Sequence, residues 1–139
     1  MVSAVSETTS RHKGISVVRL TQNIPNFRHS YGSQDAVDSL LGGHVTKVFH
    51  RNDCPVTNEW ASKIIAKDEF YKHSLSESGS VQAKASVSQS EEYSCSTMEF
   101  LGLKNGGAGN NYVVESVLFQ SGRLWQKDKR WLLTNWKQV

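Results

Sequence analysis

The chain has 139 residues, a net charge of +3, 37% hydrophobic residues and 21% charged residues, which predicts one globular domain and excludes fibrous and strongly charged disordered classes. Cys54 and Cys95 form no CxxC pair, and neither has a histidine at a zinc-finger interval, so we expect reduced thiols and no metal site. The N-terminus lacks an apolar run, and no stretch approaches the roughly 18 apolar residues of a membrane span, so we expect neither a signal peptide nor a transmembrane segment.

The first predicted element is a strand over residues 15–20 (ISVVRL). Its β-branched residues are nearly continuous, which is typical of a central strand in a parallel sheet, and Arg19 is the one exception. The run ends in Thr21, Gln22 and Asn23. Pro25 then predicts a loop, because proline cannot continue a strand ladder.

A helix, a strand and a second helix follow. Ser33 is a suitable N-cap for a helix that ends at the glycine pair 42–43, with apolar residues at helical spacing between them. Residues 44–50 (HVTKVFH) alternate as a strand does. Pro55 opens another helix, whose apolar stripe includes Trp60. Strand, helix, strand and helix in this order predict an α/β unit.

The second half of the chain changes character. Nine of the 24 residues 74–97 are serine, and large apolar side chains are almost missing, so we expect a mobile excursion. Residues 97–103, 112–120 and 131–136 predict antiparallel β structure, and the glycine-rich residues 104–111 predict a turn. We therefore divide the chain into residues 1–72, a Ser-rich flexible segment 73–96, and a β-rich extension 97–139.

The order of several short motifs carries a family resemblance. RHKGISVVRLTQN, AVDSLLGG, HVTKVFHRND and TNEWASKIIAK are followed by FLGLKNGG, VESVLFQSGRLW and WLLTNW. In this order they resemble the C-terminal part of the conjugative coupling proteins of type IV secretion, which are TraD/TraG-type DNA-translocating ATPases, over residues 11–139. The resemblance implies an α/β fold in which a partial RecA-like parallel-sheet unit precedes a small antiparallel β extension.

The same resemblance implies a function. The chain would be a truncated part of a hexameric ATPase that pumps single-stranded DNA into a secretion channel, at the cytoplasmic face of the inner membrane, with a relaxase as a further partner. The complete parent protein would use ATP and Mg²⁺. The 139 residues contain no GxxxxGK[ST] motif and no apolar strand ending in Asp-Glu, so we expect no hydrolysis by this chain alone.

The resemblance and the positions of basic residues give candidates for nucleotide and DNA contacts. The resemblance implies that Gln22 is a nucleotide sensor and that Arg11 is an arginine finger offered to a neighbouring subunit. A polar strand end and a solvated N-terminus are the respective alternatives. Arg28, Lys47 and Arg51 would line a channel for DNA phosphates, although an ordinary basic surface explains them equally well.

Two other function classes remain open from the sequence. One is a small autonomous module that binds protein or nucleic acid through its β-rich half and its basic loops. The other is a structural component of a conjugation apparatus, which would self-assemble. If the reading frame upstream of this gene encodes a P-loop, the chain is favoured as one part of an ATPase divided between two genes. An isolated gene would favour the autonomous module.

Overall fold

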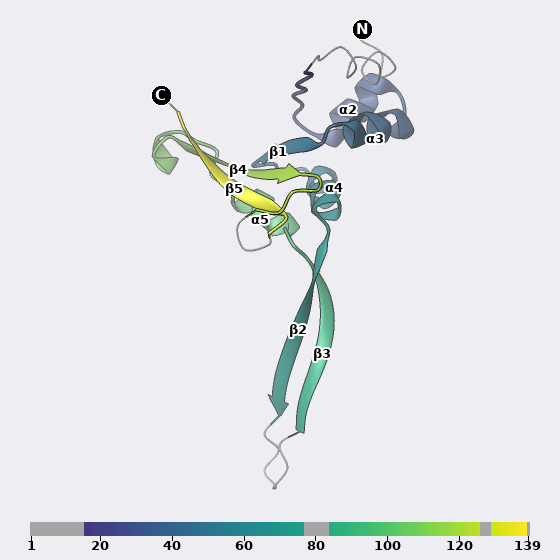
Figure 1. The fold of residues 1–139 in the computed structure, drawn as a ribbon. Coiled ribbons are helices and arrows are strands. Elements are labelled where there is room, and N and C mark those ends of the chain that lie inside the picture. Colours follow the sequence, from purple (N-terminus) through teal and green to yellow (C-terminus); the bar gives the residue numbers. More distant parts are fainter. Residues whose placement is uncertain (1–15, 77–83, 126–128, 139) are drawn as a thin grey trace.

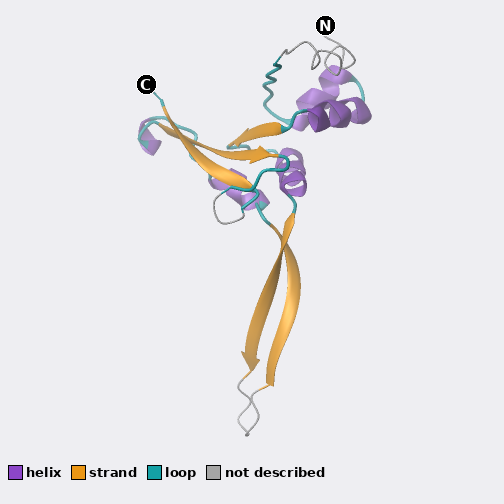
Figure 2. Ribbon diagram, viewed as in Figure 1, coloured by secondary structure: helices purple, strands orange, loops and turns teal. Residues whose placement is uncertain are grey.

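The computed structural model describes residues 16–76, 84–125 and 129–138, with backbone alone for 68–76 and 84–89. A three-stranded antiparallel sheet forms the centre, in the order β1-β4-β5. A helix pair lies beside one end of this sheet, further helices lie against it, and a long two-stranded hairpin projects from the body (Figures 1 and 2).

The helix pair comprises α2 (Ile24–Tyr31) and α3 (Gln34–Gly43). The Ser33 side chain caps α3 by accepting a hydrogen bond from the Ala36 N–H at 3.1 Å, so the predicted helix start is confirmed. Between the helices, Gly32 has a φ of 76°, a left-handed conformation that glycine adopts without steric cost. The two helices enclose a small second core: Phe27, Val37 and Leu40.

The prediction of a loop after Pro25 is wrong, because residues 24–31 form α2. Proline stands in the first turn of this helix, where its missing N–H has no intrahelical partner to lose. The preceding Asn23 caps the helix. Pro25 therefore stands in the first turn of a helix, where the sequence predicted a loop.

The central sheet is antiparallel throughout. Strand β1 (Thr46–His50) pairs with β4 (Val113–Gln120), which pairs with β5 (Trp131–Lys137). The predicted strands 44–50, 112–120 and 131–136 and the antiparallel arrangement of the last two are confirmed. The residues that the structure describes contain no parallel strand pair, so the chain has a mixed α/β fold in which β1 joins the C-terminal strands.

Helices α4 (Pro55–Ile65) and α5 (Thr97–Gly102) pack on one face of the sheet. The main core combines residues far apart in sequence: Ala61, Ile65, Cys95, Phe100, Leu103 and Val117. The predicted α4 is confirmed, but the predicted strand over 97–103 is wrong. Phe100 and Leu103, three residues apart, are both buried, which is helical and not β spacing.

The predicted central strand over residues 15–20 is also wrong for residues 16–20. These residues have no ladder partner in the part of the chain that the structure describes, and Val18 and Leu20 are 83% and 92% exposed. The Arg19 guanidinium lies 5.7 Å from the Tyr31 ring centroid and donates a hydrogen bond to the Tyr31 hydroxyl. Its contact with α2 explains a cation within an apolar run.

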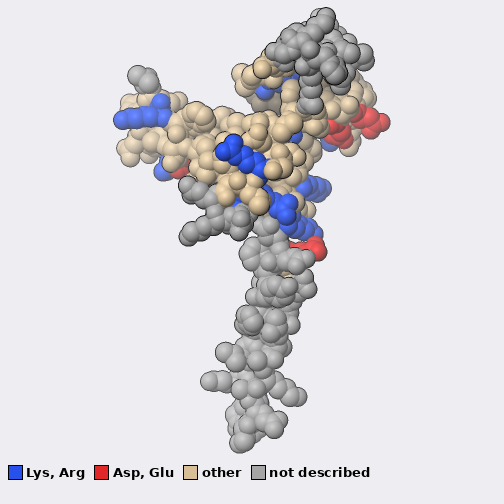
Figure 3. All heavy atoms as spheres, viewed as in Figure 1, with Lys and Arg blue, Asp and Glu red and all other residues tan. Residues whose placement is uncertain are grey.

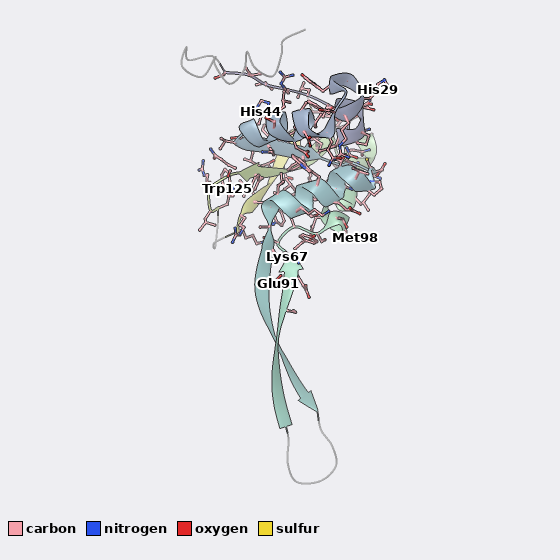
Figure 4. All side chains as sticks on the ribbon, turned by 90° about the vertical axis from the view of Figure 1, so that its right-hand side faces the viewer. His29, His44, Lys67, Glu91, Met98 and Trp125 are labelled. Carbon is pink, nitrogen blue, oxygen red and sulfur yellow. The ribbon has the colours of Figure 1, made fainter. Side chains whose placement is uncertain are left out.

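The projecting hairpin consists of β2 (Lys67–Ser76) and β3 (Lys84–Tyr93), paired antiparallel from Lys67↔Tyr93 to Ser76↔Lys84. The described part of the Ser-rich segment therefore has regular backbone pairing that its composition did not predict. At the hairpin base, the Lys67 Nζ lies 3.4 Å from the Glu91 Oε2 (Figure 4). The three-part domain division stays a prediction.

No helix among the described residues is long and apolar enough to cross a membrane. Within the same residues, no group of three or more His, Cys, Asp and Glu side chains lies together as metal ligands would.

Candidate functional site

A polar junction forms where residues 21–24 lead into α2. The Asn23 side chain accepts a hydrogen bond from the Asn26 N–H at 2.8 Å and so caps the helix. The Gln22 side chain is exposed, and among the described residues its Oε1 accepts one long bond of 3.4 Å, from the Asn26 Nδ2. The Gln22 amide is therefore accessible to a ligand.

Asn52, two residues after β1, connects three segments at this junction. Its Nδ2 donates to the Gln22 backbone carbonyl, and its Oδ1 accepts from the Cys54 N–H at 2.7 Å. Its own backbone carbonyl accepts from the Asn58 Nδ2, also at 2.7 Å. The Gln22 main chain is thus tied to the end of β1 and to the first turns of α4. We call Gln22, Asn52, Thr57 and Asn58 the Gln22 junction.

Thr57 makes the second link between α2 and α4. The Ile24 N–H, one of the amides that a helix N-terminus leaves unpaired, donates to the Thr57 Oγ1 at 3.1 Å. Both residues are buried, with Ile24 only 3% exposed. The interior hydroxyl therefore holds the start of α2 against α4.

Replacing Thr57 with valine is expected to lower the free energy of unfolding by about 1–3 kcal/mol, because the isosteric side chain leaves the buried Ile24 N–H without an acceptor. Urea denaturation followed by circular dichroism measures the change. Thr46→Val, at an exposed position on β1, is the matched control and should change stability by less than about 0.5 kcal/mol. Equal losses in the two variants would contradict the role of Thr57.

The sequence singled out Gln22, at the end of a predicted strand, but not the other members of the junction. The sequence could have indicated Asn52, because an asparagine in a turn often accepts a hydrogen bond from the backbone two residues later, as Asn52 does from Cys54. Asn58 is 3% exposed and lies one turn before Ala61, on the buried face of α4. No local pattern distinguishes such a residue, since its partner is the backbone of a separate segment.

The predicted DNA-contacting cations separate into two places. Arg28 and Lys47 line one pocket of about 370 Å³ between the α2–α3 pair, β1 and α4. Arg51 lies beyond the opposite end of β1, where its Nε is 3.8 Å from the Asp53 Oδ1. Arg11 lies outside the described residues. The structure therefore brings two of these residues together and leaves Arg51 apart.

The glycine-rich residues 104–111 form a closed turn that contains a short 3₁₀ helix, η2 (Ala108–Asn110). The Gly106 N–H donates to the Val113 carbonyl at 3.0 Å, and the Gly107 N–H donates to the Gln138 Oε1 at 2.9 Å. These amides bond within the chain and are not presented to a phosphate. The predicted turn is confirmed.

The Lys104–Glu115 ion pair braces this turn. The Glu115 carboxylate accepts the Lys104 N–H at 3.0 Å and lies 3.1 Å from the Lys104 Nζ. The hydrogen bond from the Lys104 backbone, with that of its side chain, lowers the pKa of Glu115. The contacts are structural, since both groups are engaged within the turn.

One comparison with known proteins identifies related sequences. The family model described as the TraM recognition site of TraD and TraG matches residues 4–101, which is more than half of the chain. The match includes the Gln22 junction and the pocket-lining helices, and it ends within α5, before β4 and β5. No curated protein and no solved structure matches the chain.

Proposed function

Because the chain belongs to the family that carries the TraM recognition site of TraD and TraG, the coupling proteins of conjugation, we propose that it helps a DNA-translocating ATPase pump single-stranded DNA into a secretion channel. In this role the chain forms part of a larger motor. Its partners are the nucleotide-binding part of that motor, neighbouring subunits of a hexamer, and the relaxase. It works at the cytoplasmic face of the inner membrane.

The Gln22 junction is the observation that supports a motor role. A nucleotide sensor needs a polar side chain that can reach a phosphate or the attacking water, and a rigid link that transmits its displacement. The Gln22 amide is exposed, while its main chain is bonded to Asn52 and through Asn52 to α4. A shift of Gln22 on hydrolysis would thereby move the loop after β1.

The nucleotide would be held elsewhere. No P-loop motif occurs in the 139 residues, so the phosphates of ATP and their Mg²⁺ would be bound by the complementary part of the motor. Gln22 would contribute a neutral amide that orients water or contacts the γ-phosphate. Arg11 would supply positive charge to a neighbouring subunit's nucleotide, where a guanidinium stabilises the transferred phosphoryl group.

The test combines the purified chain with the P-loop polypeptide of the same conjugation system and measures ATP hydrolysis with and without single-stranded DNA. We expect little hydrolysis by the chain alone and DNA-stimulated hydrolysis by the mixture. Gln22→Ala should reduce the stimulated rate by about tenfold or more, because the attacking water loses an orienting group. Asn135→Ala, which removes an exposed amide on β5 away from the Gln22 junction, is the matched control.

A second candidate is an autonomous binding module. The main core joins residues 61, 100 and 117 from α4, α5 and β4, so the described chain builds its core from its own residues. This favours folding without a motor. Cooperative unfolding of the isolated chain, together with no ATPase activity in any mixture, would reject the motor component and favour the module.

A further inference from the structure

The pocket between the α2–α3 pair and α4 has mainly apolar walls and an unusual set of charges. Leu41 contributes from α3, and Val56, Trp60 and Ile64 contribute from α4. Five charged side chains also line it: Arg28, Lys47, Lys63, Asp38 and Glu59. Within the described residues, no ion pair of 4.0 Å or less joins these cations to these carboxylates. Three cations and two carboxylates leave one unit of positive charge.

Arg28 has an unused donor inside the protein. It stands in the last turn of α2, and its Nε is buried without a hydrogen-bond partner among the described residues. A buried donor without an acceptor is costly, and more so when the group is charged. An arginine fork binds a carboxylate through parallel N–H donors, of which the Nε–H is one. An anion would satisfy this donor and offset the charge of the guanidinium.

Lys47 reaches the same pocket from β1. Its ammonium lies 6.0 Å from the centroids of the Trp60 and Phe119 rings and donates a hydrogen bond to the His44 backbone carbonyl. Burial lowers the pKa of Lys47, since the charge is partly removed from water. In the described part of the chain, no carboxylate forms an ion pair with it. An incoming anion would offset this desolvation.

The negative groups in the pocket distinguish between kinds of anion. A nucleic acid presents a row of phosphates and needs a continuous cationic track. Asp38 and Glu59 would repel such a chain. On the face drawn in Figure 3, the described Lys and Arg side chains form separate groups, and acidic side chains lie beside the α2–α3 pair. One carboxylate on an otherwise apolar segment suits the excess charge and the apolar walls better.

We propose that this pocket binds an acidic side chain of a partner protein, with the carboxylate between Arg28 and Lys47 and neighbouring apolar residues against Trp60 and Leu41. The occupant is an acidic protein segment that also carries a leucine-sized side chain. The pocket shares no residue with the Gln22 junction. Partner binding here and nucleotide sensing there can therefore be tested separately.

The experiment measures fluorescence anisotropy of a fluorescein-labelled peptide with an amidated C-terminus, Ser-Leu-Glu-Leu-Ser, titrated with the full chain at about 0.15 M ionic strength. The matched peptide Ser-Leu-Gln-Leu-Ser tests the need for the carboxylate. We expect the acidic peptide to bind and the amide peptide to bind at least about tenfold more weakly, because charge-assisted hydrogen bonds are lost.

Four variants test the location. Arg28→Gln and Lys47→Gln should each weaken binding of the acidic peptide about tenfold, whereas Arg51→Gln, which removes the same charge outside the pocket, should change it less than about twofold. Asp38→Asn should strengthen binding, because it removes a repelling carboxylate. This gain separates a binding role from a folding defect, and circular dichroism verifies that each variant is folded.

Several results would overturn the proposal. Equal binding of the two peptides would show that the carboxylate is not recognised. Equal weakening by Arg28→Gln and Arg51→Gln would show that binding depends on the net charge of the protein and not on the pocket. Tighter binding of an oligothymidine of about 20 nucleotides, with the same dependence on Arg28 and Lys47, would assign the pocket to nucleic acid. An inactive ATPase mixture would leave these binding results unaffected.

Discussion

Replacing Phe100 with alanine is expected to lower the free energy of unfolding by about 3–5 kcal/mol, a large part of the stability of a small domain. Phe100 is 1% exposed and lies in the main core, where its ring meets the Phe49 ring edge to face with centroids 5.7 Å apart. Truncation leaves a cavity between α4, α5 and the sheet. Urea denaturation should give a lower midpoint with an unchanged slope.

The control for this variant lies on the same helix. Met98 is 69% exposed, so Met98→Ala removes a side chain of comparable length that has little contact with the core. Its effect should be below about 0.5 kcal/mol. A Phe100→Ala loss as small as that of Met98→Ala would mean that α5 is not packed on the sheet.

Iodoacetamide is expected to modify Cys54 at least about a hundredfold faster than Cys95 in the folded protein, because the thiolate is the reacting form. Cys54 occupies the N-cap position of α4, and the hydrogen bond from the Thr57 side chain, followed by the backbone amides of Thr57 and Val56, lowers its pKa. Cys95 is fully buried, and burial, followed by the charge of Glu99, raises its pKa to about 12. Peptide mass spectrometry of a time course at pH 8 separates the two rates.

The buried thiol also makes stability depend on pH. The folded pKa of Cys95 lies above its ordinary value of 9.0, so the unfolded chain releases this proton first. Cys95 therefore stabilises the fold fully below about pH 9, and this contribution is lost between pH 9 and about 12. Cys95→Ala should remove that pH-dependent loss.

The control for the iodoacetamide experiment is denatured protein, in which Cys54 and Cys95 should be modified at similar rates. Equal rates in the folded protein would contradict burial of Cys95.

The sequence by itself determined the elements that have local signals. Ser33 predicted the start of α3, and Pro55 predicted the start of α4, because capping and the first helical turn depend on neighbouring residues alone. The alternating residues 44–50 and the runs 112–120 and 131–136 predicted their strands. The order of short motifs also indicated the family, since motif order depends on no contact.

Only the tertiary structure decided how these elements combine. A strand needs a partner, and residues 16–20 have none among the described residues, so their β-branched pattern yields an exposed segment outside any strand. Strand β1 pairs antiparallel with β4, more than 60 residues later, which no local pattern specifies. The Asn52 links and the pocket around Arg28 and Lys47 likewise join segments separated along the chain. Such contacts arise from packing, because burial and hydrogen bonding depend on which distant groups the fold brings together.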